Sequence, residues 1–274
     1  TVLPLSSAYL LISHGSRDPR PSQGMDALAQ LLRTKLETQG ATLIPKQGAE
    51  QLLSKYQERI ATPEVLVNST RYPLVGTATL ELAEIPLHEQ VRQFASVALA
   101  AGCNQLELLP LFLLPGVHVM EDIPAEVAAA KTSLGDAMVI NVRSHLGACP
   151  SLAKMLAQQL ATINADAKIL MTHGTRRAGG NAPIEAVAKD LGATVAYWLV
   201  KPSLEDQVNI LASEGAKKIA ILPYFLFSGG ITDAISQEVT RLQNQFSQLD
   251  LSLCNPIGAS SDLADLIINL IENS

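Results

Sequence analysis

The sequence predicts an α/β protein made of two similar, doubly wound parallel-sheet units that face a central cleft. Two observations carry this prediction. Short apolar runs alternate with helical periodicity along the chain, and the motifs of the first half return in the same order in the second half. Strand–helix alternation is typical of parallel sheets with helices on both faces. A chain of 274 residues is long enough for two ordinary domains.

The repeat consists of four pairs of similar segments. Ala8–Arg17 and Ala167–Arg176 each contain an apolar run, then His-Gly, then Arg. The other pairs, in chain order, are Leu82–Val91 with Leu199–Val208, Leu109–Gly116 with Leu222–Gly229, and Leu146–Ala148 with Ile257–Ala259. The separation between partners is shorter from the second pair onwards, so the first unit must hold an insertion.

From this pattern we expect an N-terminal unit at 1–164, which carries the active site, and a C-terminal unit at 165–274 with a degenerate site. The insertion is expected at about 38–73, with a polar surface helix over Gln47–Arg59. It is interpreted as a tolerated insertion without chemistry, or alternatively as a lid or a dimer contact.

Hydrophobic periodicity predicts the elements of each unit. One helical face in the first unit is formed by Met25, Leu28, Leu32 and Leu36, and one in the second unit by Ile184, Val187 and Leu191. The predicted strands of the first unit are Tyr9–Ser13, Leu80–Ala83, Leu106–Pro110 and Met138–Val142. Those of the second unit are Lys168–Thr172, Thr194–Val200, Lys218–Pro223 and Leu249–Cys254.

The composition excludes several classes of protein. Hydrophobic residues make up 47% of the chain and charged residues 17%, which is typical of a folded core and not of disorder. A net charge of −6 argues against a nucleic acid as partner. The longest apolar stretch, Leu106–Val119, contains two prolines and a glutamate. It is shorter than the roughly 20 residues that span a bilayer, so no membrane partner is expected.

The cysteines and the N-terminus predict the compartment. Cys103, Cys149 and Cys254 are an odd number without a CxxC pair, so we expect buried thiols in a reducing compartment and no disulfide framework. No basic region precedes the first apolar run, so no signal peptide is predicted. The expected location is the cytoplasm, or a plastid stroma if a transit peptide has been removed.

Three residues of metal-ligating types fall at the carboxyl ends of predicted strands in the first unit. His14 directly follows the first strand, and Glu81 lies in or at the end of the second. His118 lies in the loop after the apolar segment Leu106–Leu114. Because ligands bind beyond the carboxyl ends of parallel strands, we expect these side chains at one sheet edge. Two imidazoles and a carboxylate suit a divalent first-row metal. The alternative for each histidine is a hydrogen-bonded turn residue.

The second unit serves as an internal control. It keeps His173, but Trp198 is expected at the Glu81 position and no histidine follows Phe227-Ser-Gly. It therefore cannot build the same ligand set. His88 and His145 are interpreted as structural.

Arginines follow the His-Gly turn in both units. Arg17 and Arg20 follow His14, and Arg176 and Arg177 follow its counterpart in the second unit. Guanidinium groups near the N-terminus of a helix suit the binding of carboxylates, so these four are candidates for substrate binding. Solvated surface arginines are the alternative.

The segments that carry these residues resemble the class II chelatases. The His14-Gly-Ser-Arg opening, the Leu80-Glu-Leu segment before a proline, and Pro110–Pro124 carry the resemblance. Within this group the chain is similar to the long, two-unit sirohydrochlorin chelatases of siroheme and cobalamin synthesis, for which Pro223–Gly229 is also typical. The similarity covers nearly the whole chain except the insertion.

The resemblance implies that the chain inserts Co²⁺ or Fe²⁺ into sirohydrochlorin without ATP. The metal would then be a substrate, and no tightly bound cofactor is expected. The resemblance assigns His14 and His118 to metal binding and to the uptake of pyrrole protons, with help from Glu81. The many carboxylates of sirohydrochlorin would give the arginines their ligands. No particular oligomeric state is predicted.

Two other functions compete with this interpretation. A non-catalytic carrier of metal or tetrapyrrole could use the same cleft. A phosphoryl-transfer enzyme built on His14 is less favoured, because the chain has no P-loop and the arginine follows His-Gly instead of preceding it.

Overall fold

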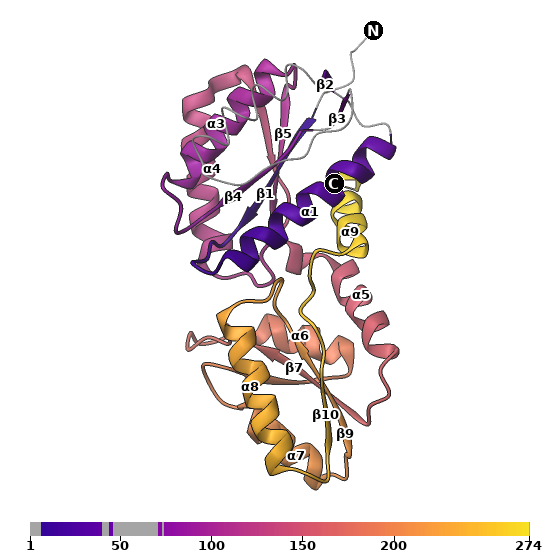
Figure 1. Ribbon diagram of the computed structural model, residues 1–274. Coiled ribbons are helices and arrows are strands. Elements are labelled where there is room, and N and C mark those ends of the chain that lie inside the picture. Colours follow the sequence, from indigo (N-terminus) through magenta and orange to yellow (C-terminus); the bar gives the residue numbers. More distant parts are fainter. Residues whose placement is uncertain (1–6, 40–43, 46–70, 73, 274) are drawn as a thin grey trace. The chain divides into compact units, whose positions relative to one another are not determined.

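The computed structural model describes residues 7–39, 44–45, 71–72 and 74–273 (Figure 1). Within these residues it contains two four-stranded parallel sheets with flanking helices, which confirms the predicted α/β class. The helix predicted over Gln47–Arg59 lies outside the described residues. Of the insertion, the structure describes the antiparallel pair β2 (Ile44–Pro45) and β3 (Arg71–Tyr72).

The first sheet has the strand order β4-β1-β5-β6. Its strands are β1 (Ser7–Ser13), β4 (Val75–Thr79), β5 (Gln105–Pro110) and β6 (Val139–Val142). Five consecutive residues of β1, Ala8–Ile12, are buried. A near-continuous apolar run of this kind is what a parallel strand needs, because helices cover both of its faces.

Four helices cover this sheet. They are α1 (Pro19–Thr38), α3 (Leu87–Ala100), α4 (Ile123–Leu134) and α9 (Ser261–Glu272). The α3 and α4 helices pack on one face, where Phe94 and Ile123 join Leu10 in one buried cluster. The α1 and α9 helices lie side by side on the other face (Figure 1), joined by an ion pair of 2.8 Å between Lys35 and Asp265.

The second sheet has the order β10-β9-β7-β8, which is the same arrangement of equivalent strands. Its strands are β7 (Ala167–Thr172), β8 (Thr194–Tyr197), β9 (Lys218–Pro223) and β10 (Asp250–Leu253). Its helices are α5 (Pro150–Ala161), α6 (Ala182–Leu191), α7 (Leu204–Ser213) and α8 (Gly230–Gln245). The α7 and α8 helices share one buried cluster with Ile169 and Met171. Leu170 points to the opposite face, because side chains alternate along a strand.

The compact units of the structure differ from the two contiguous units expected. One comprises residues 1–148 together with 259–274, and the other residues 149–258. The last helix after each sheet therefore belongs to the other unit: α5 follows β6 but packs in the second unit, and α9 follows β10 but packs on α1. A sequence repeat records the order of motifs, and it does not record which sheet a terminal helix covers.

Two expectations about local structure need correction. Leu80–Ala83, expected as a strand, is the turn that follows β4, because pairing with β1 ends at Ser13 and Thr79. The expectation of buried thiols holds for Cys103, whereas Cys149 and Cys254 are partly exposed. No disulfide joins the three, all of which lie among the described residues.

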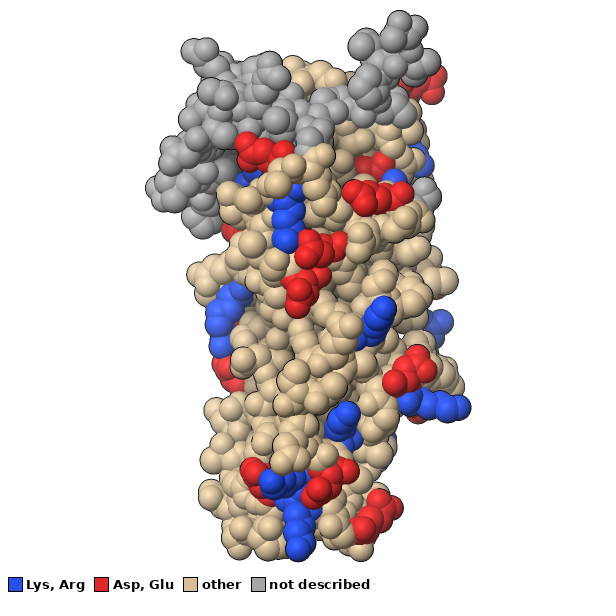
Figure 2. Space-filling view, turned by 90° about the vertical axis from the view of Figure 1, so that its right-hand side faces the viewer, with Lys and Arg blue, Asp and Glu red and all other residues tan. Residues whose placement is uncertain are grey.

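The surface of the described residues carries charges of both signs. On the face shown in Figure 2, acidic and basic side chains are intermixed and wide areas carry neither. Among the helices that the structure describes, none combines the length and the apolar character that a membrane crossing needs.

Candidate metal centre

The structure brings His14, Glu81 and His118 together at the carboxyl edge of the first sheet. His14 is the first residue after β1, and Glu81 is the second residue after the neighbouring strand β4. His118 follows β5, the other neighbour of β1. One potential ligand atom of each residue lies within 4.8 Å of the others. The three sequence-predicted residues thus form a single cluster.

Glu81 lies between the two imidazoles. Its Oε2 is 3.4 Å from Nδ1 of His14, and its Oε1 is 3.5 Å from Nε2 of His118. The two rings meet edge to face, with centroids 4.5 Å apart and planes at 80°. One ligand atom from each ring and one carboxylate oxygen lie within 4.8 Å of one another, as metal coordination by three side chains requires.

The cluster is accessible to solvent and also contacts a buried aromatic side chain. The side chains of His14, Glu81 and His118 are 54%, 49% and 32% exposed. Phe112, which is buried, stands behind His14 with its ring centroid at 5.7 Å. A cation bound here would keep coordination positions accessible from solution, which is the arrangement of reactive rather than structural metal sites.

The backbone around Glu81 is tightly constrained by the turn after β1. Gly15 has φ +103°, and a Cβ at this position would overlap the carbonyl oxygen of Glu81. The amide of Glu81 donates to the carbonyl oxygen of His14 at 2.9 Å. Glycine at position 15 is therefore needed for both its conformation and its size. The signal for it was present in the repeat, since Gly174 occupies the same place in the second unit.

Leu82, next to Glu81, is a conformational outlier. It has φ +58°, and it is the non-glycine residue with positive φ among the described residues. Its side chain is 63% exposed. Such a conformation costs on the order of 1–3 kcal/mol and persists where the surroundings impose it, often at functional sites. No sequence pattern predicted this strain.

His118 opens a single π-helical turn, His118–Asp122, that leads into α4. Turns of this kind are rare and are frequent at functional sites. Within the turn, Nδ1 of His118 lies 2.6 Å from Oδ2 of Asp122. From the sequence a loop was expected here, and Asp122 was not predicted as a residue of the site.

The four candidate arginines differ in their surroundings. Arg17, Arg176 and Arg177 are exposed. Arg20 is in an ion pair with Asp18, whose Oδ2 lies 2.6 Å from Nη2. Hydrogen bonds from the Arg20 side chain and backbone lower the pKa of Asp18 to about 2, and Asp18 also caps α1. Arg17 and Arg20 belong to the unit that contains the cluster, whereas Arg176 and Arg177 belong to the other unit.

The other histidines of the first unit lie outside the cluster, as their structural interpretation requires. Nδ1 of His88 is 2.8 Å from Oε2 of Glu126. Burial lowers the pKa of His145. Neither histidine belongs to the group with metal-binding geometry, which among the described residues consists of His14, Glu81 and His118.

The second sheet presents a different edge. His173 is exposed, and its Nδ1 is 2.9 Å from the carbonyl oxygen of Gly174. Ser13 pairs with Thr79 in the first sheet and Thr172 with Tyr197 in the second. Counting on from these pairs, Leu199 and not Trp198 corresponds to Glu81. The expected assignment of Trp198 was one residue off, because the connection between strand and helix is one residue shorter after β8 than after β4.

The same register identifies the counterpart of His118. Ile12 pairs with Pro110 in the first sheet and Met171 with Pro223 in the second. By this count Ile231 corresponds to His118, and it packs against the core of the second unit. The second edge therefore retains one histidine and has apolar residues at the positions of the other two ligands.

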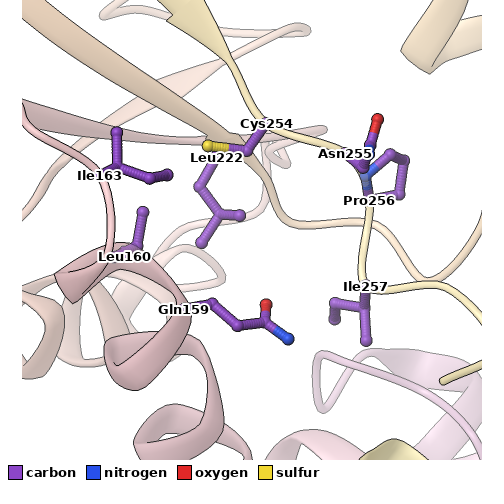
Figure 3. A pocket seen from close by; sticks show the side chains of 8 residues that line it. All are labelled: Gln159, Leu160, Ile163, Leu222, Cys254, Asn255, Pro256 and Ile257. Carbon is purple, nitrogen blue, oxygen red and sulfur yellow. The ribbon is translucent and has the colours of Figure 1, made fainter. Parts of the chain in front are cut away.

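A cavity of about 270 Å³ lies in the second unit (Figure 3). Its walls include Leu160 and Ile163 at the end of α5, Leu222 of β9 and Cys254 after β10. Burial raises the pKa of the Cys254 thiol. A thiol kept protonated in this way is a poor nucleophile and a poor metal ligand, so the cavity has no evident reactive group.

Two sheets of the same strand order and a His–Glu–His cluster at one sheet edge agree with the resemblance to class II chelatases seen in the sequence. The comparison with family models confirms this resemblance. The family model CbiX matches residues 8–163 and 167–274, and the chain belongs to this family.

Individual relatives agree with this assignment. The chain is 25% identical over 209 residues to a sirohydrochlorin cobaltochelatase of Priestia megaterium, covering 71% of this chain and 67% of the relative. It is 21% identical over 240 residues to a sirohydrochlorin ferrochelatase of the same organism, covering 83% and 85%. The solved structure of SirB from Bacillus subtilis with Fe³⁺ superposes with a TM-score of 0.64 at 18% identity, covering 98% of this chain and 95% of that one. At this identity the structural likeness concerns the fold.

Proposed function

We propose that this chain is a lyase that inserts Co²⁺ or Fe²⁺ into sirohydrochlorin, with the metal held by His14, Glu81 and His118. The observation that carries the proposal is the convergence of these three side chains within 4.8 Å at an exposed sheet edge. The names of the two Priestia megaterium relatives supply the substrate, since one is a cobaltochelatase and the other a ferrochelatase of sirohydrochlorin. The metal is a substrate of the reaction and not a resident cofactor.

The donor set suits transient binding of such an ion. Two imidazoles and one carboxylate bind divalent cobalt and iron, and the carboxylate offsets part of the charge. Three protein ligands leave further coordination positions for water and then for ring nitrogens. Because the three side chains are between 32% and 54% exposed, a large planar substrate can reach the ion without opening the protein core.

The reaction exchanges one cation for two protons. As the ring nitrogens take the metal, two pyrrole N–H groups each release a proton, so that charge is balanced without an oxidant or reductant. Imidazole and carboxylate side chains are protein groups suited to accept protons from a reacting substrate near neutral pH. We propose that His14 and His118 take up protons as they release the metal, with Glu81 assisting. The proposed reaction needs no ATP, and the chain has no P-loop motif.

The arginines are proposed to bind carboxylates of the macrocycle. Arg17, Arg176 and Arg177 are exposed and can form paired hydrogen bonds to a carboxylate. Arg20 is already paired with Asp18, so its contribution is expected to be the smallest of the four.

A turnover assay tests the proposal against a carrier function. Purified protein is mixed with excess sirohydrochlorin and Co²⁺ or Fe²⁺ under anaerobic conditions, and the absorbance of the metallated ring is followed over time. An enzyme yields many equivalents of product per protein, at a rate proportional to protein concentration. Product or bound complex that stops at one equivalent would establish a carrier and overturn the proposal.

A further inference from the structure

The side chain of Asp122 has a single evident task in the structure, which is to hold His118. Its Oδ2 lies 2.6 Å from Nδ1 of His118. Aspartate at the start of a helix commonly caps the backbone, yet Asp122, which precedes α4, makes no cap hydrogen bond within the described first turn of that helix. The carboxylate is instead directed back along the π-helical turn towards the imidazole.

The hydrogen bond fixes where the imidazole carries its proton. A carboxylate oxygen can only accept, so the bond requires a proton on Nδ1 of His118. In the neutral ring the other nitrogen, Nε2, then has the free lone pair. Nε2 is the atom that lies 3.5 Å from Oε1 of Glu81, within the metal cluster. The nitrogen left free by Asp122 is therefore the nitrogen that faces the proposed metal position.

The backbone supports the same arrangement. His118 and Asp122 are the first and last residues of the π-helical turn, and the amide of Ile123 donates to the carbonyl oxygen of His118. Both partners are thus attached to one closed backbone loop. Ile123 and Val127 anchor the following helix in the core.

We propose that Asp122 is a positioning residue that holds His118 in the Nδ1–H form and aims Nε2 at the metal. This inference rests on the proposed function in one respect, that His118 is a metal ligand. It adds a residue that touches neither the metal nor the macrocycle and acts through His118. Carboxylates in this relation to a metal-bound histidine fix its tautomer and orientation, and their loss typically costs 10- to 100-fold in metal affinity or activity.

Helix α4 offers a matched control. Glu126 lies one helical turn beyond Asp122 and forms the same kind of pair, with Oε2 at 2.8 Å from Nδ1 of His88. His88 is outside the metal cluster. Truncation of Glu126 therefore removes a carboxylate–histidine pair from the same helix without changing the support of His118. It also removes the hydrogen bond that Oε2 of Glu126 accepts from the backbone amide of His88 at 2.6 Å.

The experiment measures the tautomer and the metal affinity separately. The chain has 5 histidines, so nitrogen-15 spectra of the full-length protein labelled at histidine are simple enough to assign, with His118→Ala identifying the resonance. Nδ1 of His118 is expected to be protonated in the parent at neutral pH, and this preference should be lost in Asp122→Ala. Co²⁺ alone, titrated by its visible absorption, should bind about 10- to 100-fold more weakly to Asp122→Ala. Asp122→Asn keeps a hydrogen-bond acceptor but loses the charge, so its Co²⁺ affinity should lie between those of the parent and of Asp122→Ala.

The outcomes separate this proposal from the proposed function. Glu126→Ala should bind Co²⁺ within about twofold of the parent, as expected of a pair that does not support a ligand. A parent protein with Nε2–H at His118 would overturn the proposal, and this measurement does not require Asp122→Ala to fold. Parent-like Co²⁺ affinity in a folded Asp122→Ala protein would overturn it too. A protein that shows the expected tautomer and Co²⁺ binding but inserts no metal would instead refute the proposed enzyme.

Discussion

The two sheet edges of this protein differ in chemistry although they share a topology. In both sheets the strand before the His-Gly turn is an inner strand, flanked by β4 and β5 in the first sheet and by β8 and β9 in the second. Equivalent backbone hydrogen bonds hold the turn against the segment that follows β4 or β8. The first edge carries His14, Glu81 and His118, whereas Leu199 and Ile231 occupy the corresponding positions of the second. A parallel sheet thus provides the location for a site, and a few residues after its strands decide whether the site has any chemistry.

The difference extends to the supporting residue. Counted in the same register, the second unit has Ile235 where the first has Asp122, and Ile235 is completely buried. Position 118 opens a π-helical turn, while position 231 lies in the regular first turn of α8. In the second unit both positions belong to a continuous apolar helix face, so ligand and support are replaced together by core packing.

The largest effect should follow removal of His118, an imidazole that has no counterpart in the second unit. His118→Ala is expected to reduce metal insertion by more than about 100-fold, exceeding the usual loss for a residue that merely supports a ligand. The protein should stay folded, because the side chain is about one-third exposed. Steady-state turnover with Co²⁺ and circular dichroism check both expectations.

His88→Ala is the matched control for this variant, since His88 is also paired with a carboxylate but lies outside the cluster. Its turnover should stay near that of the parent. Near-parent turnover in a folded His118→Ala protein would remove His118 from the site.

Glu81→Gln should have the next largest effect. The amide preserves the shape of the side chain but loses the negative charge and the capacity to accept a proton. We expect kcat to fall by about 100-fold, the lower end of what positioned proton transfer contributes, with KM for sirohydrochlorin little changed. Glu84→Gln, at an exposed glutamate three residues further on, is the control. A kcat within a few-fold of the parent would mean that Glu81 has only a structural role in its turn.

A smaller effect should distinguish the two His-Gly turns. An alanine side chain at position 15 would overlap the carbonyl oxygen of Glu81, whereas at position 174 its Cβ would lie 2.9 Å from Cβ of Tyr197. Both glycines have positive φ, so each substitution should destabilise the fold by roughly 1–3 kcal/mol.

Only Gly15→Ala should also lower kcat of the folded protein. A loss of about 10-fold is expected, because displacement of a catalytic group by 1 Å can cost about 100-fold. Thermal melts followed by turnover measurements well below each melting temperature separate the two effects. Equal kcat in Gly15→Ala and Gly174→Ala would show that the position of Glu81 does not depend on Gly15.

The sequence predicted the shared features of the two units better than their differences. Periodicity located the strands within one or two residues in most cases, because buried parallel strands are continuous apolar runs. It also predicted that His14, Glu81 and His118 meet, since the carboxyl ends of neighbouring parallel strands lie at one edge. The strand predicted over Leu80–Ala83 was wrong because an apolar pattern does not reveal where the partner strand ends.

Other features depend on three-dimensional packing and left little trace in the sequence. The support of His118 by Asp122 requires the π-helical turn, and no local sequence pattern predicted this turn. The exchange of α5 and α9 between the compact units depends on which sheet each helix covers. The one-residue error at Trp198 arose because the repeat was aligned through the helices α3 and α7. The connection from β8 to α7 is one residue shorter than the connection from β4 to α3, so the strands align with a different offset.

The smallest effect is expected for His173→Ala, and it tests the comparison most directly. His173 and His14 occupy the same position of the repeat, so a role shared by the two edges would make both substitutions equally damaging. Ligand count argues otherwise. His14 lies 3.4 Å from Glu81 and has a second imidazole beside it, whereas the second edge has leucine and isoleucine at the equivalent positions. A lone imidazole competes poorly with water for a divalent ion, because reactive metal sites usually have three protein ligands. His14→Ala should therefore lower kcat by more than about 100-fold, while His173→Ala should leave kcat within a few-fold of the parent. A modest rise in KM for His173→Ala would be compatible with this prediction, because His173 lies in the same loop as Arg176 and Arg177 and can contact a carboxylate of the substrate there. An equal collapse of kcat in both folded variants would refute a single metal site and show that both edges handle the ion.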